Sequence, residues 1–102
     1  MRELNDAFRS TLLGGRVMLT SGVAALGADG IAGIMQAVRT FSNFTSDNDP
    51  HGEHDFGTCS WGLHRVLWKI DYYDVGLEYG SPDPTDPALT TRVLTIMLAS
   101  EY

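Results

Sequence analysis

Residues 63–73, LHRVLWKIDYY, constrain the fold more than any other stretch of the chain, because their apolar and polar side chains alternate. The side chains that share one side of an extended backbone are Val66, Trp68, Ile70 and Tyr72, and those on the other side are Arg65, Lys69, Asp71 and Tyr73. A period of two is typical of a strand that packs one face on a core and turns the other toward water. The stretch therefore predicts a half-buried strand of an antiparallel sheet.

Two further runs supply partners for this strand. Residues 54–61, HDFGTCSW, precede it and are joined to it around Gly62, which predicts a β-hairpin. Residues 16–20, RVMLT, are apolar and β-branched enough for another strand. A short run after residue 74 is a candidate for one more, so a sheet of three or four strands is expected.

The N-terminal part of the chain has two stretches with the helical period. Leu4, Phe8 and Leu12 recur every four residues, which predicts a helix over residues 2–13 that ends at the glycine pair that follows. A second helix is predicted to begin with Asp29 as its N-cap. Its apolar face consists of Ile31, Ile34, Met35, Val38 and Phe41.

Residues 87–100 are apolar over most of a helical circumference, and Asp86 before Pro87 is a strong helix start. They predict a third helix that is buried on two sides, inside the fold or against a partner. With 43% hydrophobic residues, the 102 residues suffice for one core. We therefore expect a single α+β domain over residues 1–102, with a small antiparallel sheet of three or four strands and about three helices packed on one face.

Residues 42–53 form a polar loop that overlaps the stretch NDPHGEHDFG, and two interpretations compete for it. In the structural one, Asn and Asp side chains bond the loop backbone, and a pair of His54 and a carboxylate ties the loop down. The alternative is a small metal-dependent or acid-base enzyme centred on His51, Glu53, His54 and Asp55. His-x-x-His alone is a poor metal spacing, and no nucleophile motif accompanies it. The structural interpretation is favoured, so no enzyme activity, catalytic residue or cofactor is predicted.

Acidic residues gather between residues 47 and 86, where nine of them stand against two basic ones in a chain of net charge −6. Nucleic-acid binding needs a stripe of basic residues, and the absence of one disfavours direct binding to DNA or RNA. An acidic surface is often only a solubility device, but it also suits a protein partner with a basic surface. Interleaved Trp and Tyr are typical interface anchors. The predicted partner-binding residues are Asp47, Asp49, Glu53, Asp55, Asp71, Tyr73, Asp74 and Glu78.

The single cysteine, Cys59, allows no internal disulfide, and the first residues lack the apolar core of a signal peptide. No apolar run approaches the roughly 18 residues needed to cross a membrane. A cytoplasmic protein without a membrane partner is expected, either as a monomer or as a homodimer.

Six stretches cover nearly the whole chain: LNDAFR, GGRVMLTSGV, AVRTFSNFTSDNDPHGEHDFG, WKIDYYD, GSPDPTDP and TRVLTIMLASEY. Together they resemble a small bacterial domain-of-unknown-function family, number thirty-seven-sixty-eight. NDPHGEHDFG and RVLTIMLASEY are the most specific parts of the likeness. The resemblance implies a cytoplasmic protein of bacteria, their plasmids and other mobile elements, with no catalytic residue to carry over.

Small acidic proteins of mobile elements are often inhibitors of host defence, including anti-CRISPR proteins that imitate or block nucleic acid. By that association, the leading hypothesis is a non-enzymatic inhibitor. Its acidic segment would block a basic nucleic-acid-binding surface of a CRISPR or other defence complex. The enzyme centred on the His51–His54 loop is the alternative.

Overall fold

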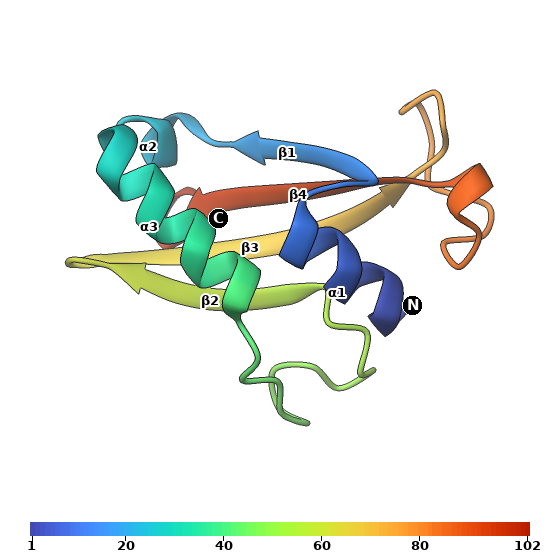
Figure 1. Ribbon diagram of the computed structural model, residues 1–102, viewed down its shortest axis with the longest axis horizontal. Helices are drawn as coiled ribbons and strands as arrows, with labels where there is room; N and C mark the ends of the chain where they lie inside the picture. Colours follow the sequence, from blue (N-terminus) through green and yellow to red (C-terminus); the bar gives the residue numbers. More distant parts are fainter.

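The computed structural model describes residues 1–102 as one four-stranded sheet with helices on one of its faces (Figure 1). The elements in chain order are α1 (Arg2–Thr11), β1 (Gly15–Leu19), α2 (Ser21–Ala24), α3 (Gly27–Thr40), β2 (Phe56–Trp61), β3 (His64–Tyr73), the 3-10 helix η1 (Pro87–Leu89), β4 (Thr91–Leu98) and the 3-10 helix η2 (Ala99–Glu101). The predicted α+β class is confirmed. None of the helices has the length and apolar character needed to span a bilayer.

The sheet has the strand order β1-β4-β3-β2. β3 pairs antiparallel with both β2 and β4, whereas β1 runs parallel to β4. The sheet is therefore mixed, although most of its pairings are antiparallel as expected. β1 lies near the N-terminus and β4 near the C-terminus. The part of the chain between these two paired strands contains α2, α3 and the β2–β3 hairpin.

The predicted hairpin and its alternation are confirmed. Trp61 pairs with His64 across a turn in which Gly62 has a φ of 58°. Val66, Trp68 and Ile70 are buried under the helices, and the side chains between them point to the opposite face. α1 was also predicted correctly, but it ends two residues early, where Leu12 takes the left-handed conformation.

The predicted C-terminal helix is wrong, because residues 91–98 form β4. Asp86 does cap a helical turn by accepting a hydrogen bond from the Ala88 N–H at 2.9 Å, but that turn is only η1. β4 carries apolar side chains on both of its faces, Leu94 and Ile96 toward the core and Val93 and Met97 toward the open side, so the run imitates a helix that is apolar all round. The expectation that a helix over residues 87–100 packs inside the fold or against a partner is therefore wrong as well, because these residues do not form that helix.

The start of α3 also differs from the prediction. The helix begins at Gly27, so Asp29 lies inside its first turn and is not the N-cap. There its carboxylate still meets the positive end of the helix dipole. A Cβ at Gly33 would collide with the ring of Trp61, so this glycine lets β2 approach the helix closely.

The core lies between α1, α3 and the sheet face that they cover (Figure 1). Its buried residues are Phe8, Val23, Ile34, Val38, Val66, Trp68, Ile70, Leu94 and Ile96. No helix covers the other face, which we call the open sheet face. By strand alternation its members include Arg16 and Met18 of β1, Lys69, Asp71 and Tyr73 of β3, and Val93 and Thr95 of β4.

Candidate functional site

His54 sits at the centre of the contacts that hold the 42–55 loop against α1. Its backbone is left-handed, with a φ of 57°. Its ring stacks on Phe44 with centroids 3.8 Å apart and planes 5° from parallel. A non-glycine residue adopts this conformation only where its surroundings impose it.

Each ring nitrogen of His54 faces a carboxylate. Nδ1 lies 2.9 Å from Oδ1 of Asp6, and Nε2 lies 3.6 Å from Oδ2 of Asp49. Asp49 also accepts a hydrogen bond from the His54 N–H at 3.3 Å, and its side chain is only 7% exposed. Both carboxylates are therefore occupied by this histidine.

Arg9 extends these contacts from α1 to α3. Its guanidinium donates hydrogen bonds to the carbonyl oxygens of Val38 and Phe41, at 2.8 and 2.6 Å, and to Oδ1 of Asp6 at 3.0 Å. The two carbonyls lie at the C-terminal end of α3, where helical carbonyls lack partners and a cation is favoured. We call this group the His54 link; it consists of Asp6, Arg9, Phe44, Asp49 and His54.

A second polar network joins the loop to the sheet through Asn5, which is fully buried. Its Nδ2 donates to the Tyr72 hydroxyl at 2.7 Å and to the Glu53 carbonyl at 2.9 Å. Its Oδ1 accepts from Nε of Arg92 at 2.8 Å. Tyr72 in turn donates to Oδ2 of Asp55 at 3.0 Å.

Burial governs the ionisation of this network. It raises the pKa of Tyr72 well above the ordinary value, and the nearby Asp55 carboxylate adds to the effect. Burial is also the largest cause that raises the pKa of Glu53, and the negative charge of Asp55 is the second largest. Both groups are thus held toward their protonated forms.

These contacts show how the stretch NDPHGEHDFG is held: His54 ties the loop to α1, and Asp55 ties it to β3. For the enzyme alternative, His51 is exposed, whereas Glu53, His54 and Asp55 are partly buried. No group of three or more His, Cys, Asp or Glu side chains is close enough to hold a metal ion. The contacts of His54 and Asp55 are those that the structural interpretation expects.

The eight residues predicted to bind a partner separate into two groups. Asp47, Asp49, Glu53 and Asp55 lie in the loop beside α1, where Asp49 and Asp55 are occupied by internal hydrogen bonds. The others lie at or beyond the end of β3, and we call them the tip group: Asp71, Tyr73, Asp74 and Glu78. Asp71 and Tyr73 point to the open sheet face, opposite Tyr72, which bonds Asp55. Asp71 and Tyr73 are therefore on the side of the sheet opposite Asp55.

The tip group surrounds a tight turn after β3. Asp74 accepts the Leu77 N–H on its carbonyl and the Glu78 N–H on Oδ1, both at 3.0 Å. Leu77 is left-handed, with a φ of 60°. The Glu78 carboxylate has no partner within the chain, whereas Asp71 pairs with Lys69 at 3.0 Å, which raises the pKa of the lysine.

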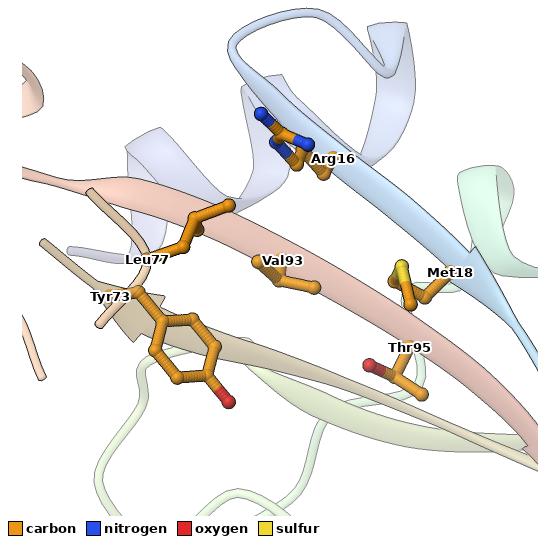
Figure 2. A pocket seen from close by; sticks show the side chains of 6 residues that line it. All are labelled: Arg16, Met18, Tyr73, Leu77, Val93 and Thr95. Atoms are coloured by element: carbon orange, nitrogen blue, oxygen red, sulfur yellow. The ribbon is translucent and has the colours of Figure 1, made fainter. Parts of the chain in front are cut away.

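Beside the tip group, the open sheet face has a hollow of about 350 Å³. Figure 2 shows Tyr73 and Leu77 at one end, Met18 and Thr95 at the other, Val93 between them and Arg16 along β1. The Arg16 guanidinium has no ion pair or hydrogen bond within the chain. The floor is apolar and the rim is polar, which is the usual composition of a binding site.

Sequence reasoning named only Tyr73 among the six residues of this hollow. Four of the others could have been found from the alternation in RVMLT and in TRVLTIML, which puts Arg16 with Met18 and Val93 with Thr95. The second run has the apolar pattern of a helix, so the sequence does not indicate which of its residues share a strand face. Leu77 has no sequence signal, because its position depends on the turn.

Comparison with known proteins gives one match. No curated protein and no solved structure matches the chain. The model of the family described as "Protein of unknown function (DUF3768)" matches residues 19–101. The match extends from the end of β1 to η2 and excludes α1, which supplies Asp6 and Arg9 of the His54 link. The chain therefore belongs to the family of unknown function DUF3768, as its sequence motifs predicted.

Proposed function

We propose that this chain is a non-enzymatic binding protein that docks on a basic surface of a protein partner through its tip group. The observation that carries the proposal is the difference between the two acidic groups. Asp49 and Asp55 of the loop are occupied by internal hydrogen bonds. In the tip group Asp71 pairs with Lys69 and Asp74 accepts one backbone N–H, whereas Glu78 has no partner in the chain. A charge without an internal partner remains available to a second molecule.

Exposed apolar side chains beside these carboxylates support the same surface. Val75 is 68% exposed, Tyr79 is 72% exposed and Tyr73 is 37% exposed, within one short segment. Solitary exposed apolar residues are common, but a group of this kind is typical of an interaction site. Tyrosine is a favoured anchor, because it buries much area for little loss of conformational entropy.

We further propose that the partner is a nucleic-acid-binding protein in the cytoplasm. A surface that combines carboxylates with tyrosines suits a partner whose own ligand is nucleic acid, since such proteins carry basic stripes. A subunit of a CRISPR or other defence complex in the cytoplasm is a partner of this class. Under this proposal the chain would inhibit the complex by covering its basic surface.

The test is capture of a partner from a lysate of the host cell. The tip variant combines Asp71→Asn, Asp74→Asn and Glu78→Gln, in which the amide oxygen introduced at position 74 can still accept the Glu78 N–H. The matched control combines Glu3→Gln, Asp29→Asn and Asp47→Asn, three exposed acids elsewhere. Wild type and control should capture the same basic protein, less of it as salt rises, and the tip variant should lose roughly tenfold in affinity. Equal capture by both variants would refute the proposal.

A further inference from the structure

We infer that the hollow on the open sheet face receives an apolar side chain of the partner, between a carboxylate of the partner at Arg16 and a basic group of the partner at Asp71. This inference rests on the proposed function and adds the chemistry of the segment that binds. It assigns a role to Arg16, Met18, Leu77 and Val93, none of which belongs to the tip group.

The strand register sets the order of these three contacts. Arg16 of β1 pairs with Val93 of β4, and Val93 pairs with Asp71 of β3. A cation, an apolar side chain and a carboxylate therefore form one row across three neighbouring strands. The carboxylate of Asp71 also pairs with Lys69 at 3.0 Å, but its side chain is 37% exposed and so remains accessible to a second basic group. Because strands lie about 4.8 Å apart, the two charged positions are about 10 Å apart at the backbone. Side chains of one short segment can span that distance.

The surroundings of the row favour an apolar group at its middle. Met18 and Leu77 stand on either side of Val93, and Met18 is 55% exposed (Figure 2). Leu77 is held there in a left-handed conformation that is unfavourable for a branched side chain. An apolar side chain that enters the hollow would cover Met18 and Val93 and remove them from water.

A second copy of the chain fits this surface poorly. The two-fold axis that would pair Arg16 with Asp71 of another copy runs over Val93, so it would set one hollow against the other. The result would be a void, whereas stable interfaces are packed as closely as protein interiors. Each copy also carries a net charge of −6. A partner with a protruding apolar group is the better complement.

The experiment selects a phage-displayed library of random short peptides on the immobilised full chain. Enriched peptides should carry a large apolar residue with an acidic residue on one side and Lys or Arg on the other. One enriched peptide is then synthesised with a fluorescent label and titrated with wild type and variants. Arg16→Glu and Met18→Asp should each weaken its binding by roughly tenfold. A peptide whose acidic residue is changed to Lys should regain affinity for Arg16→Glu.

Matched controls lie on the same sheet at its far end. Arg65→Glu changes an exposed arginine of the open sheet face, and Leu63→Asp changes the fully exposed leucine of the hairpin turn. Both should alter peptide binding by less than about twofold. Thermal unfolding of every variant should give a midpoint close to that of wild type, because all four side chains are exposed.

Several outcomes would overturn the inference. The selection could enrich peptides that are only basic, and their binding could weaken in the tip variant but not in Arg16→Glu or Met18→Asp. That result would refute the binding of an apolar side chain in the hollow and leave the proposed function standing. A selection that enriches no apolar-containing peptide would refute it as well. Light scattering that gives twice the chain mass, reduced to one chain mass by Arg16→Glu, would assign the surface to a second copy instead. The capture experiment with the tip variant tests the proposed function independently of these peptide measurements.

Discussion

The His54 link and the open sheet face use similar residues in opposite ways. Each contains carboxylates, an arginine and one left-handed residue that is not glycine, His54 in the first and Leu77 in the second. In the His54 link every charge has a partner inside the chain. On the open sheet face Asp71 pairs with Lys69, but Arg16 has no internal partner, and neither has Glu78 in the turn that follows β3. Acidic composition alone therefore does not locate a binding surface, because some charged side chains are occupied inside the chain and others are not.

The largest loss of stability is expected from a substitution of Arg9 in the His54 link. In Arg9→Met, the carbonyls of Val38 and Phe41 and the carboxylate of Asp6 lose a buried cation. The free energy of unfolding in urea should fall by about 3 kcal/mol. Arg39→Met is the control, because Arg39 is exposed and donates only to the Ser10 carbonyl; its cost should stay below about 1 kcal/mol. Similar costs for the two variants would mean that Arg9 does not join the helices.

Substitution of His54 and of Leu77 by glycine allows a direct comparison of the two regions, because both residues are left-handed. His54→Gly relieves backbone strain but removes the stacking on Phe44 and both carboxylate contacts, so we expect a net loss of about 2 kcal/mol. Leu77→Gly relieves the same strain and removes only a side chain that is 36% exposed. Its unfolding free energy should stay within about 1 kcal/mol of wild type. A large loss in Leu77→Gly would show that Leu77 belongs to the core.

The Asn5 network gives a pH dependence of defined sign. Because the pKa of Tyr72 is raised in the fold, the folded state keeps a proton that the unfolded state loses near the ordinary value of 10. Stability should therefore fall as pH rises above about 10, and Tyr72→Phe should remove this part of the slope. The variant should cost about 1 kcal/mol at neutral pH, because Asn5 and Asp55 lose the hydroxyl.

The exposed Tyr79 supplies the control for this pH experiment. Tyr79→Phe should leave both the neutral stability and the alkaline slope as they are in wild type. If Tyr72→Phe keeps the full alkaline slope, the hydroxyl of Tyr72 is not held in its protonated form by the fold.

Short-range patterns predicted much of the fold, because hairpins and amphipathic helices depend on neighbouring residues. The β2–β3 hairpin, β1 and α1 follow from alternation and from the helical period. β4 did not, because a central strand with apolar residues on both faces lacks clear alternation. The β1–β4 pairing links residues from opposite ends of the chain, and no local signal specifies it.

The candidate sites depended even more on distant contacts. The sequence predicted that His54 and Asp55 hold the loop, but it did not identify their partners. His54 contacts Asp6, which is 48 residues away along the chain, and Asp55 contacts Tyr72, which is 17 residues away. The acidic residues formed one group in the sequence because burial cannot be inferred from charge. Only the fold separates Asp49, which is occupied by His54, from Glu78, which is not.

The most direct test compares the free energies of unfolding in urea of two double variants that remove two carboxylate charges each. Asp49→Asn with Asp55→Asn removes charges that have side-chain or backbone partners within the chain. Asp74→Asn with Glu78→Gln removes two charges of the tip group: Glu78 has no internal partner, and the Asp74 carboxylate accepts only the Glu78 N–H, a hydrogen bond that the amide oxygen of asparagine can keep. We predict a loss of about 2 kcal/mol or more for the first variant and a change within about 0.5 kcal/mol for the second. Equal losses, or a larger loss in the variant of the tip group, would contradict the division between structural and available carboxylates.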